Sequence, residues 1–137
     1  MHLLFVYGSL KEGFPNFHHN AGRRVAGTYL TVQAHPFMLV DGQLPCLLPS
    51  PGEGLPVRGQ LFEVDDAALA TMDRLERVGE PGGYTRRPIR IKRDDAAGDE
   101  VTAFVYMQDP AALLQRPGPH VGPITEYTME HAARLSW

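Results

Sequence analysis

Glycine and proline punctuate this chain from one end to the other. Its 137 residues include 14 glycines and 12 prolines, with no internal repeat and no low-complexity tract. Because both residues interrupt regular structure and favour turns, the chain is restricted to short elements joined by many turns. A chain of this length has the usual size of one domain. No stretch has the composition of a linker, so we expect residues 1–137 to form a single domain.

Apolar patterning predicts about six short strands. Continuous or alternating apolar residues mark residues 2–7, 25–32, 37–40, 57–64, 84–92 and 101–107. The first of these is apolar on both faces and is expected to be buried, whereas Pro88 favours an edge position or a bulge in the fifth. Residues 43–55 hold three prolines and two glycines, so we expect a loop with at most a short extended piece.

Two segments have helical character. Asp65-Asp66 offers an N-cap to a helix over Ala67–Glu76, which the glycine-rich residues 79–83 end. A second helix is expected over Ile124–Leu135, where apolar residues recur at helical spacing. Because strands and helices do not alternate regularly, we predict an α+β fold, a small mixed β-barrel or curled sheet with flanking helices, and not a doubly wound sheet.

Glu76 lies where an apolar residue is expected. On a helical wheel with Leu69 at zero, Glu76 falls at roughly 340°, inside the apolar stripe. Burial disfavours a carboxylate, and the carbonyl end of a helix repels it, so both effects raise its pKa towards neutrality. Such a group suits proton transfer. Two other interpretations stay open: Glu76 turns out into solvent at the helix end, or it pairs with a neighbouring arginine, Arg77, Arg86 or Arg87.

A second constellation lies at residues 5–10. An apolar strand ends there in the turn Tyr7-Gly8-Ser9-Leu10, so successive backbone N–H groups lose their strand partners. If Gly8 adopts positive φ, these groups converge into a small anion-binding nest suited to a carboxylate. The spacing fits neither a P-loop nor a dinucleotide turn, and an ordinary turn is the alternative. Tyr84 and Tyr106 carry hydroxyls that suit a polar ligand or the boundary of the core.

Charge and composition exclude several classes of function. The net charge of −3 gives no general attraction for nucleic acid or anionic lipid. Cys46 is the only cysteine, which excludes an intrachain disulfide, and no apolar run has the length of a signal peptide or a membrane span. We therefore expect a cytoplasmic protein. The spacing of His18, His19 and His35 suggests no metal site, and the acidic residues of 94–100 suggest a solvated turn.

The motifs together resemble the γ-glutamyl cyclotransferase-like superfamily, and within it the γ-glutamylamine cyclotransferases. Its opening signature is similar to Val6-Tyr7-Gly8-Ser9-Leu10-Lys11-Glu12-Gly13 followed by Pro15-Asn16. Residues 59–64 match G-x-x-[FY]-x-[IV], residues 69–76 match L-x-x-[LM]-D-x-[LF]-E, and residues 84–86 match Y-x-R, with Phe104-Val105-Tyr106 resembling the last strand. The resemblance covers roughly residues 3–107, and we recognise nothing from Met107 onward.

This resemblance implies a mixed β-barrel and an enzyme that needs no metal or cofactor. It implies that the turn from Tyr7 to Leu10 lines the γ-glutamyl site and that Glu76 is the acid/base, with Tyr84 and Tyr106 near the site. The substrate's α-amine would attack its own γ-carbonyl, forming 5-oxoproline and releasing an amine, as from γ-glutamyl-lysine. The main alternative is a binding module that holds γ-glutamyl or amino-acid-like ligands without chemistry. A further alternative is a biosynthetic enzyme that removes a γ-glutamyl group from a larger amine.

Overall fold

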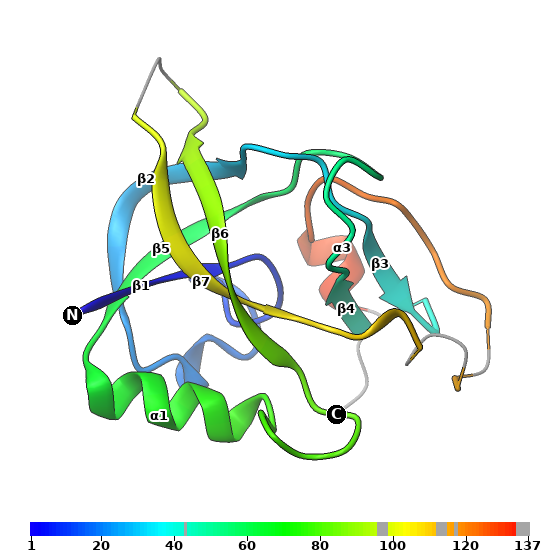
Figure 1. Ribbon diagram of the computed structural model, residues 1–137, viewed down its shortest axis with the longest axis horizontal. Helices are drawn as coiled ribbons and strands as arrows, with labels where there is room; N and C mark the ends of the chain where they lie inside the picture. The colour runs from blue at the N-terminus through cyan, green and yellow to red at the C-terminus, as the bar shows by residue number, and fades with distance from the viewer. Residues whose placement is uncertain (43, 96–98, 112–114, 117, 134–137) are drawn as a thin grey trace.

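Five strands close into a small barrel. The computed structural model describes residues 1–42, 44–95, 99–111, 115–116 and 118–133. The barrel strands are β1 (His2–Val6), β2 (Arg23–Thr31), β5 (Arg58–Val64), β6 (Thr85–Arg93) and β7 (Val101–Met107), in the spatial order β1-β5-β2-β6-β7. Neighbours pair antiparallel, except that β1 and β7 pair parallel and close the barrel. Figure 1 shows this arrangement.

The predicted α+β barrel with flanking helices is confirmed, although the strands divide differently. Two further strands, β3 (Phe37–Val40) and β4 (Leu44–Leu47), form a separate hairpin beside the barrel (Figure 1). Residues 37–40 therefore leave the barrel, and the loop expected over residues 43–55 contains a strand. This four-residue strand is the short extended piece that the prediction allowed for, and it tolerates Pro45 because only one neighbouring strand is present.

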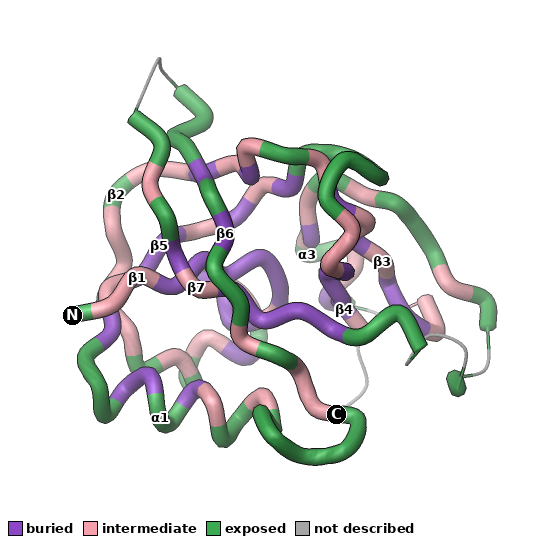
Figure 2. The backbone as a smooth tube through the Cα atoms, viewed as in Figure 1, coloured by how far each residue is buried: buried purple, intermediate pink, exposed green. Residues whose placement is uncertain are grey.

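Alternating side chains divide the apolar residues between two cores. Along β1, Phe5 points into the barrel interior and Leu4 and Val6 point to the opposite face. All three side chains are buried, which confirms the strand expected to be apolar on both faces. The outer face is covered by α1 (Asp66–Leu75), whose side towards the barrel is buried and whose other side is exposed (Figure 2).

The predicted helix over Ala67–Glu76 is confirmed within one residue at each end. Asp65 caps it by accepting a hydrogen bond from the Ala68 N–H at 2.7 Å, an interaction typically worth about 1 kcal/mol. Leu69 and Met72 are buried against the barrel, each contributing roughly 1.5–3 kcal/mol of apolar burial. Glu76 is the C-cap residue.

Pro88 lies where proline is tolerated. Strand β6 pairs with β7 from Thr85 to Ile91, whereas its pairing with β2 covers only Ile91 to Arg93. Pro88 precedes the stretch paired with β2, so β7 is the one strand that pairs with it among the described residues, as the expected edge position requires. Of the polar turn predicted at residues 94–100, residues 96–98 lie outside the described residues.

The second predicted helix is mostly wrong. Within the described part of residues 124–135, only α3 (Met129–Ala132) is helical. Residues 124–128 are extended because their backbone bonds to other elements: the Ile124 N–H donates to the Phe37 carbonyl, and the Arg58 N–H donates to the Thr125 carbonyl. Tertiary hydrogen bonds thus outweigh the helical spacing.

No helix in the described residues is long and apolar enough to cross a membrane.

Candidate active site

One cavity gathers the residues singled out from the sequence. It has a volume of about 260 Å³ and lies where β1 ends, between the end of α1 and the β3–β4 hairpin. Its lining includes the whole turn from Tyr7 to Leu10 together with Glu76, Tyr84 and Tyr106. Since a water molecule in the liquid takes about 30 Å³, the space can hold a small organic ligand. The turn, Glu76, Tyr84 and Tyr106 are far apart in the sequence and come together only in the folded chain.

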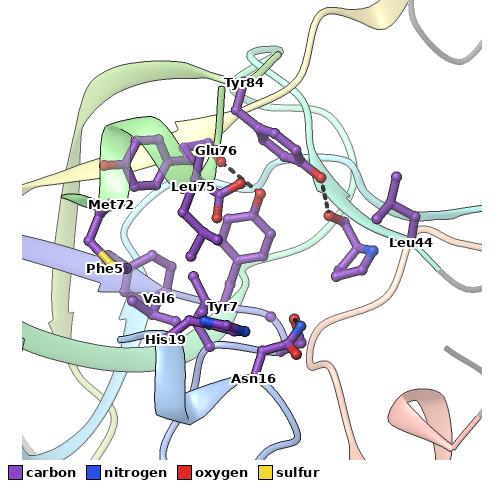
Figure 3. A pocket seen from close by; sticks show the side chains of 15 residues that line it. Phe5, Val6, Tyr7, Asn16, His19, Leu44, Met72, Leu75, Glu76 and Tyr84 are labelled. Carbon is purple, nitrogen blue, oxygen red and sulfur yellow. Dashed lines mark hydrogen bonds between the residues drawn. The ribbon is translucent and has the colours of Figure 1, made fainter. Parts of the chain in front are cut away.

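Glu76 directs its carboxylate into this cavity (Figure 3). Burial raises the pKa of Glu76 from 4.5 to about 7, which is the direction expected from the sequence. The interpretation in which Arg77, Arg86 or Arg87 pairs with Glu76 is wrong, because no described arginine forms an ion pair with its carboxylate; Arg77 pairs with Glu80 and Arg86 with Asp73. The interpretation in which Glu76 turns out into solvent is also wrong. Among the described residues, none donates a hydrogen bond to its carboxylate.

The helix end fixes where this carboxylate points. Arg77 follows in the left-handed region, with φ of 57°, which ends the helix at Glu76. The Glu76 carbonyl then accepts a hydrogen bond from the Tyr84 N–H at 3.0 Å. Gly83 permits this return, since a Cβ there would lie 1.9 Å from the Arg77 carbonyl oxygen. The glycine-rich segment therefore holds the start of β6 against the carboxylate-bearing helix end.

The turn after β1 presents free backbone donors. The carbonyls of Gly8, Ser9 and Leu10 each accept a hydrogen bond, from Lys11 N, Asn16 N and Asn20 Nδ2 respectively. Within the described part of the chain, no group accepts a hydrogen bond from the N–H groups of Gly8, Ser9 or Leu10. Gly8, Ser9 and Leu10 thus have carbonyls that accept hydrogen bonds within the protein and N–H groups that are available beside the cavity. Such free N–H groups can bind an anion.

Gly8 serves this turn differently from the prediction. Positive φ was expected, but Gly8 is not among the residues in the left-handed region. Its lack of a side chain is needed for close approach instead, because a Cβ there would lie 3.1 Å from a ring carbon of Pro45 on β4. The hairpin can therefore pack directly on the turn.

The three tyrosines that line the cavity each donate the hydroxyl proton in a hydrogen bond to another group of the protein. Tyr7 donates to the Tyr106 carbonyl at 2.7 Å, Tyr84 to the Pro45 carbonyl at 2.9 Å, and Tyr106 to an Asp73 carboxylate oxygen at 2.7 Å. Burial raises the pKa of each, so they stay protonated. Their rings line the cavity, and each hydroxyl can only accept a further hydrogen bond from a ligand.

Four lining residues that lie outside β1 and α1 were not among the sequence candidates. Leu44 and Pro45 belong to the segment 43–55 predicted as loop, while Asn16 and His19 come from the segment after the turn, where Phe17–His19 form a short 3-10 helix. Asn16 stands in the quoted opening signature, which could have identified it. His19 was considered only in rejecting a metal site, and no sequence signal marks it as a lining residue. No described residue beyond Tyr106 lines the cavity.

The charged residues of the lining limit what the cavity can bind and exchange. Among the described residues that line it, Glu76 is the only acidic one, and none is a lysine or an arginine. Among the described residues, no group of three or more histidine, cysteine, aspartate or glutamate side chains is placed to hold a metal ion. The cavity can therefore bind an anion through neutral N–H donors and exchange a proton through a single carboxyl group.

Comparisons with known proteins identify the family of this chain. The family model described as "Gamma-glutamyl cyclotransferase, AIG2-like" matches residues 4–128, so the likeness extends beyond residue 107 into the segment where none was recognised. The γ-glutamylaminecyclotransferase of Mus musculus is 33% identical over 114 residues, which cover 75% of each chain. A relative from Arabidopsis thaliana is 35% identical over 95 residues; these cover 65% of this chain and 50% of that longer protein.

The fold is also similar to that of a solved structure. The crystal structure of an AIG2-like protein from Mus musculus superposes with a TM-score of 0.70 at 32% identity, covering 85% of this chain and 84% of that one. On the extent of the family match and on this shared fold, the chain belongs to the γ-glutamyl cyclotransferase, AIG2-like family.

Proposed function

We propose that this protein is a γ-glutamyl cyclotransferase that converts a γ-glutamyl amine into 5-oxoproline and the free amine. The observation that carries the proposal is the presence, in one cavity, of a half-buried carboxyl group, which has no hydrogen-bond or ion-pair partner among the described residues, together with free peptide N–H groups. Glu76 supplies the first and the turn from Gly8 to Leu10 the second. This arrangement suits a ligand with both an ammonium group and a carboxylate, which is the head of an amino acid.

The turn would bind the α-carboxylate of the γ-glutamyl group. Three neutral donors in a water-poor site bind a carboxylate without a salt bridge, and their rigid placement fixes the direction of the α-amine. The chain can then fold back until the α-nitrogen lies beside the γ-carbonyl carbon. Holding two reacting groups in this way supplies a large part of the rate acceleration in intramolecular reactions.

Glu76 would carry the protons. As the α-nitrogen attacks, its bond to the γ-carbon forms and Glu76 accepts a proton from the ammonium group. The bond from the γ-carbon to the leaving nitrogen then breaks as Glu76 returns a proton to that nitrogen. Overall the α-nitrogen loses two protons and the leaving nitrogen gains two, so that a lactam and an ammonium ion result. A carboxyl group with a pKa of about 7 can perform both steps near neutral pH.

Similarity and the cavity wall support one choice of leaving amine. The Mus musculus relative is a γ-glutamylaminecyclotransferase, and Leu44 and Pro45 of the hairpin offer an apolar surface to an alkyl chain. We therefore propose γ-glutamylamines such as γ-glutamyl-lysine as the substrate class. A binding module without chemistry remains the alternative that the experiment must separate.

The test is a panel of γ-glutamyl compounds that differ only in the leaving amine, scored by the release of 5-oxoproline. We expect turnover by the wild type. Because general acid–base catalysis contributes about 10²–10⁴-fold, Glu76→Gln and Glu76→Ala should lose that much in kcat while the fold survives. Glu80→Gln is the matched control, since Glu80 is exposed and pairs only with Arg77.

Two outcomes would contradict the proposal. If the wild type binds γ-glutamyl compounds without releasing 5-oxoproline, the chain is a binding module. If Glu76→Gln retains full turnover, the reaction does not use this carboxyl group.

A further inference from the structure

Asn16 makes three hydrogen bonds, two of which hold the anion-binding turn. Its N–H donates to the Ser9 carbonyl at 3.1 Å, its Nδ2 donates to Ser9 Oγ at 2.9 Å, and its carbonyl accepts from the His19 N–H at 2.9 Å. Its side chain lines the cavity and the residue is only 8% exposed. Figure 3 shows Asn16 at the bottom of the view, beside His19. The side-chain amide is therefore fixed in place next to a single hydroxyl.

This contact decides what the Ser9 hydroxyl can do. A hydroxyl has one proton and two lone pairs. Because Asn16 Nδ2 donates to Ser9 Oγ, the hydroxyl proton must point elsewhere. Among the described residues, none accepts a hydrogen bond from Ser9 Oγ, and Ser9 lines the cavity. The proton is thus available to a ligand, unlike the hydroxyl protons of the three lining tyrosines.

We propose that Asn16 is a positioning residue that keeps the Ser9 hydroxyl turned into the cavity as a hydrogen-bond donor to the substrate α-carboxylate. The proposal rests on the γ-glutamyl site described above and extends it. Ser9 would then contribute two donors, its N–H and its hydroxyl, to the same carboxylate. An amide is required at position 16 because a carboxylate there would accept the Ser9 proton and turn it away from the ligand.

A double-mutant cycle in the full chain tests this. The ligand is 5-oxoproline, which carries the carboxylate, and its Kd is measured by isothermal titration calorimetry. Hydrogen bonds to charged groups are the stronger class, so we expect Ser9→Ala to weaken binding about tenfold or more, and Ser9→Thr to restore it. In the Asn16→Asp background the hydroxyl is already diverted, so Ser9→Ala should change Kd by less than about twofold.

Two controls separate orientation from general disruption. Asn20→Ala makes an equivalent change in the same loop, but Asn20 bonds the Leu10 carbonyl and not Ser9, so its effect on Kd should combine additively with that of Ser9→Ala. Pyrrolidinone, which is 5-oxoproline without the carboxylate, should bind Ser9→Ala and the wild type equally. Should Asn16→Asp fail to fold, Asn16→Ala releases the hydroxyl to rotate, and the Ser9→Ala effect should then shrink at least about twofold.

The possible failures are distinguishable. If the wild type binds no 5-oxoproline and turns over no γ-glutamyl compound, the proposed function fails and this inference with it. If the wild type binds 5-oxoproline but Ser9→Ala weakens binding equally with asparagine, aspartate or alanine at position 16, only the role of Asn16 is overturned. If Ser9→Ala binds as tightly as the wild type, the donor role of the hydroxyl is overturned.

Discussion

Glu76 shows how one residue can be placed against its own preference for solvent. Its carboxylate lies in a mostly apolar cavity, and no described residue donates a hydrogen bond to it. Burial raises its pKa to about 7. The helix end and the return of Tyr84 fix its position. Such an arrangement costs stability and supplies a proton acceptor that functions near neutral pH.

The pH dependence of catalysis follows from this pKa. The first step needs the ionised carboxylate, so we expect kcat/KM to rise with pH through about 7 as Glu76 loses its proton. The profile should be measured between about pH 5 and 9 with a γ-glutamylamine. A profile that stays flat from about pH 5 to 8 would contradict the assignment of Glu76 as the base.

The same shift affects stability. Between pH values of about 4.5 and 7, folded Glu76 keeps a proton that the unfolded chain has lost, so the free energy of unfolding decreases as pH rises. Glutamine removes this dependence. We expect Glu76→Gln to be more stable than the wild type by up to about 3 kcal/mol at about pH 8, and about equally stable at about pH 4. Urea denaturation at the two pH values measures the difference; a Glu76→Gln protein less stable than the wild type at the higher pH would contradict it.

The β3–β4 hairpin is the element that turns the end of the barrel into a cavity. It lies outside the closed sheet and is fastened through Tyr84, which donates to the Pro45 carbonyl, and through Tyr7, whose hydroxyl accepts from the Leu47 N–H. The close approach of Gly8 to Pro45 completes the contact. Tyr7 and Tyr84 thus shape the cavity through the wall that they hold.

Loosening this element should change substrate binding more than chemistry. Tyr84→Phe leaves the Pro45 carbonyl without its donor, so we expect a loss of about 1 kcal/mol in stability and a several-fold rise in KM with a smaller change in kcat. Tyr29→Phe is the matched control, because the Tyr29 ring is buried but its hydroxyl bonds to none of the described residues. Equal effects of the two substitutions on KM would argue against the role of the hairpin.

At the scale of the whole molecule, the residues after the last barrel strand belong to the core. Tyr127 is fully buried, packs against Phe14 and His131, and its carbonyl accepts from Lys11 Nζ at 2.6 Å. Since Lys11 directly follows the anion-binding turn, the extended segment 124–128 supports the site from behind without lining it. The family match to residue 128 has the same limit.

Removing the Tyr127 side chain should therefore destabilise the whole fold. We expect Tyr127→Ala to cost about 3–5 kcal/mol, the range for large aromatic truncations in cores, as measured by urea denaturation. Tyr127→Phe should be neutral or slightly stabilising, because the buried hydroxyl has no partner among the described residues. Met129→Ala, at a 54% exposed position, should change stability by less than about 0.5 kcal/mol. A small effect of Tyr127→Ala would place this segment outside the cooperative core.

The sequence by itself determined the features that depend on local patterns. Apolar alternation located the five barrel strands, Asp65 and the glycines bounded the first helix, and the position of Glu76 on the wheel marked it as inward-facing. The turn from Tyr7 to Leu10 was recognisable because a strand that ends in Gly-Ser leaves peptide donors without partners. These inferences succeeded because spacing of 2 or 3.6 residues directly sets which side of an element each side chain occupies.

Only the tertiary structure decided how these pieces meet. It placed the hairpin with Pro45 against Gly8, replaced most of the predicted second helix by an extended segment bonded to β3 and β5, and set Asn16 under Ser9. It also showed that the hydroxyl groups of Tyr7, Tyr84 and Tyr106 donate hydrogen bonds to other groups of the protein. These outcomes depend on hydrogen bonds and packing between residues far apart in the chain, which override local propensity and leave no periodic signal in the sequence.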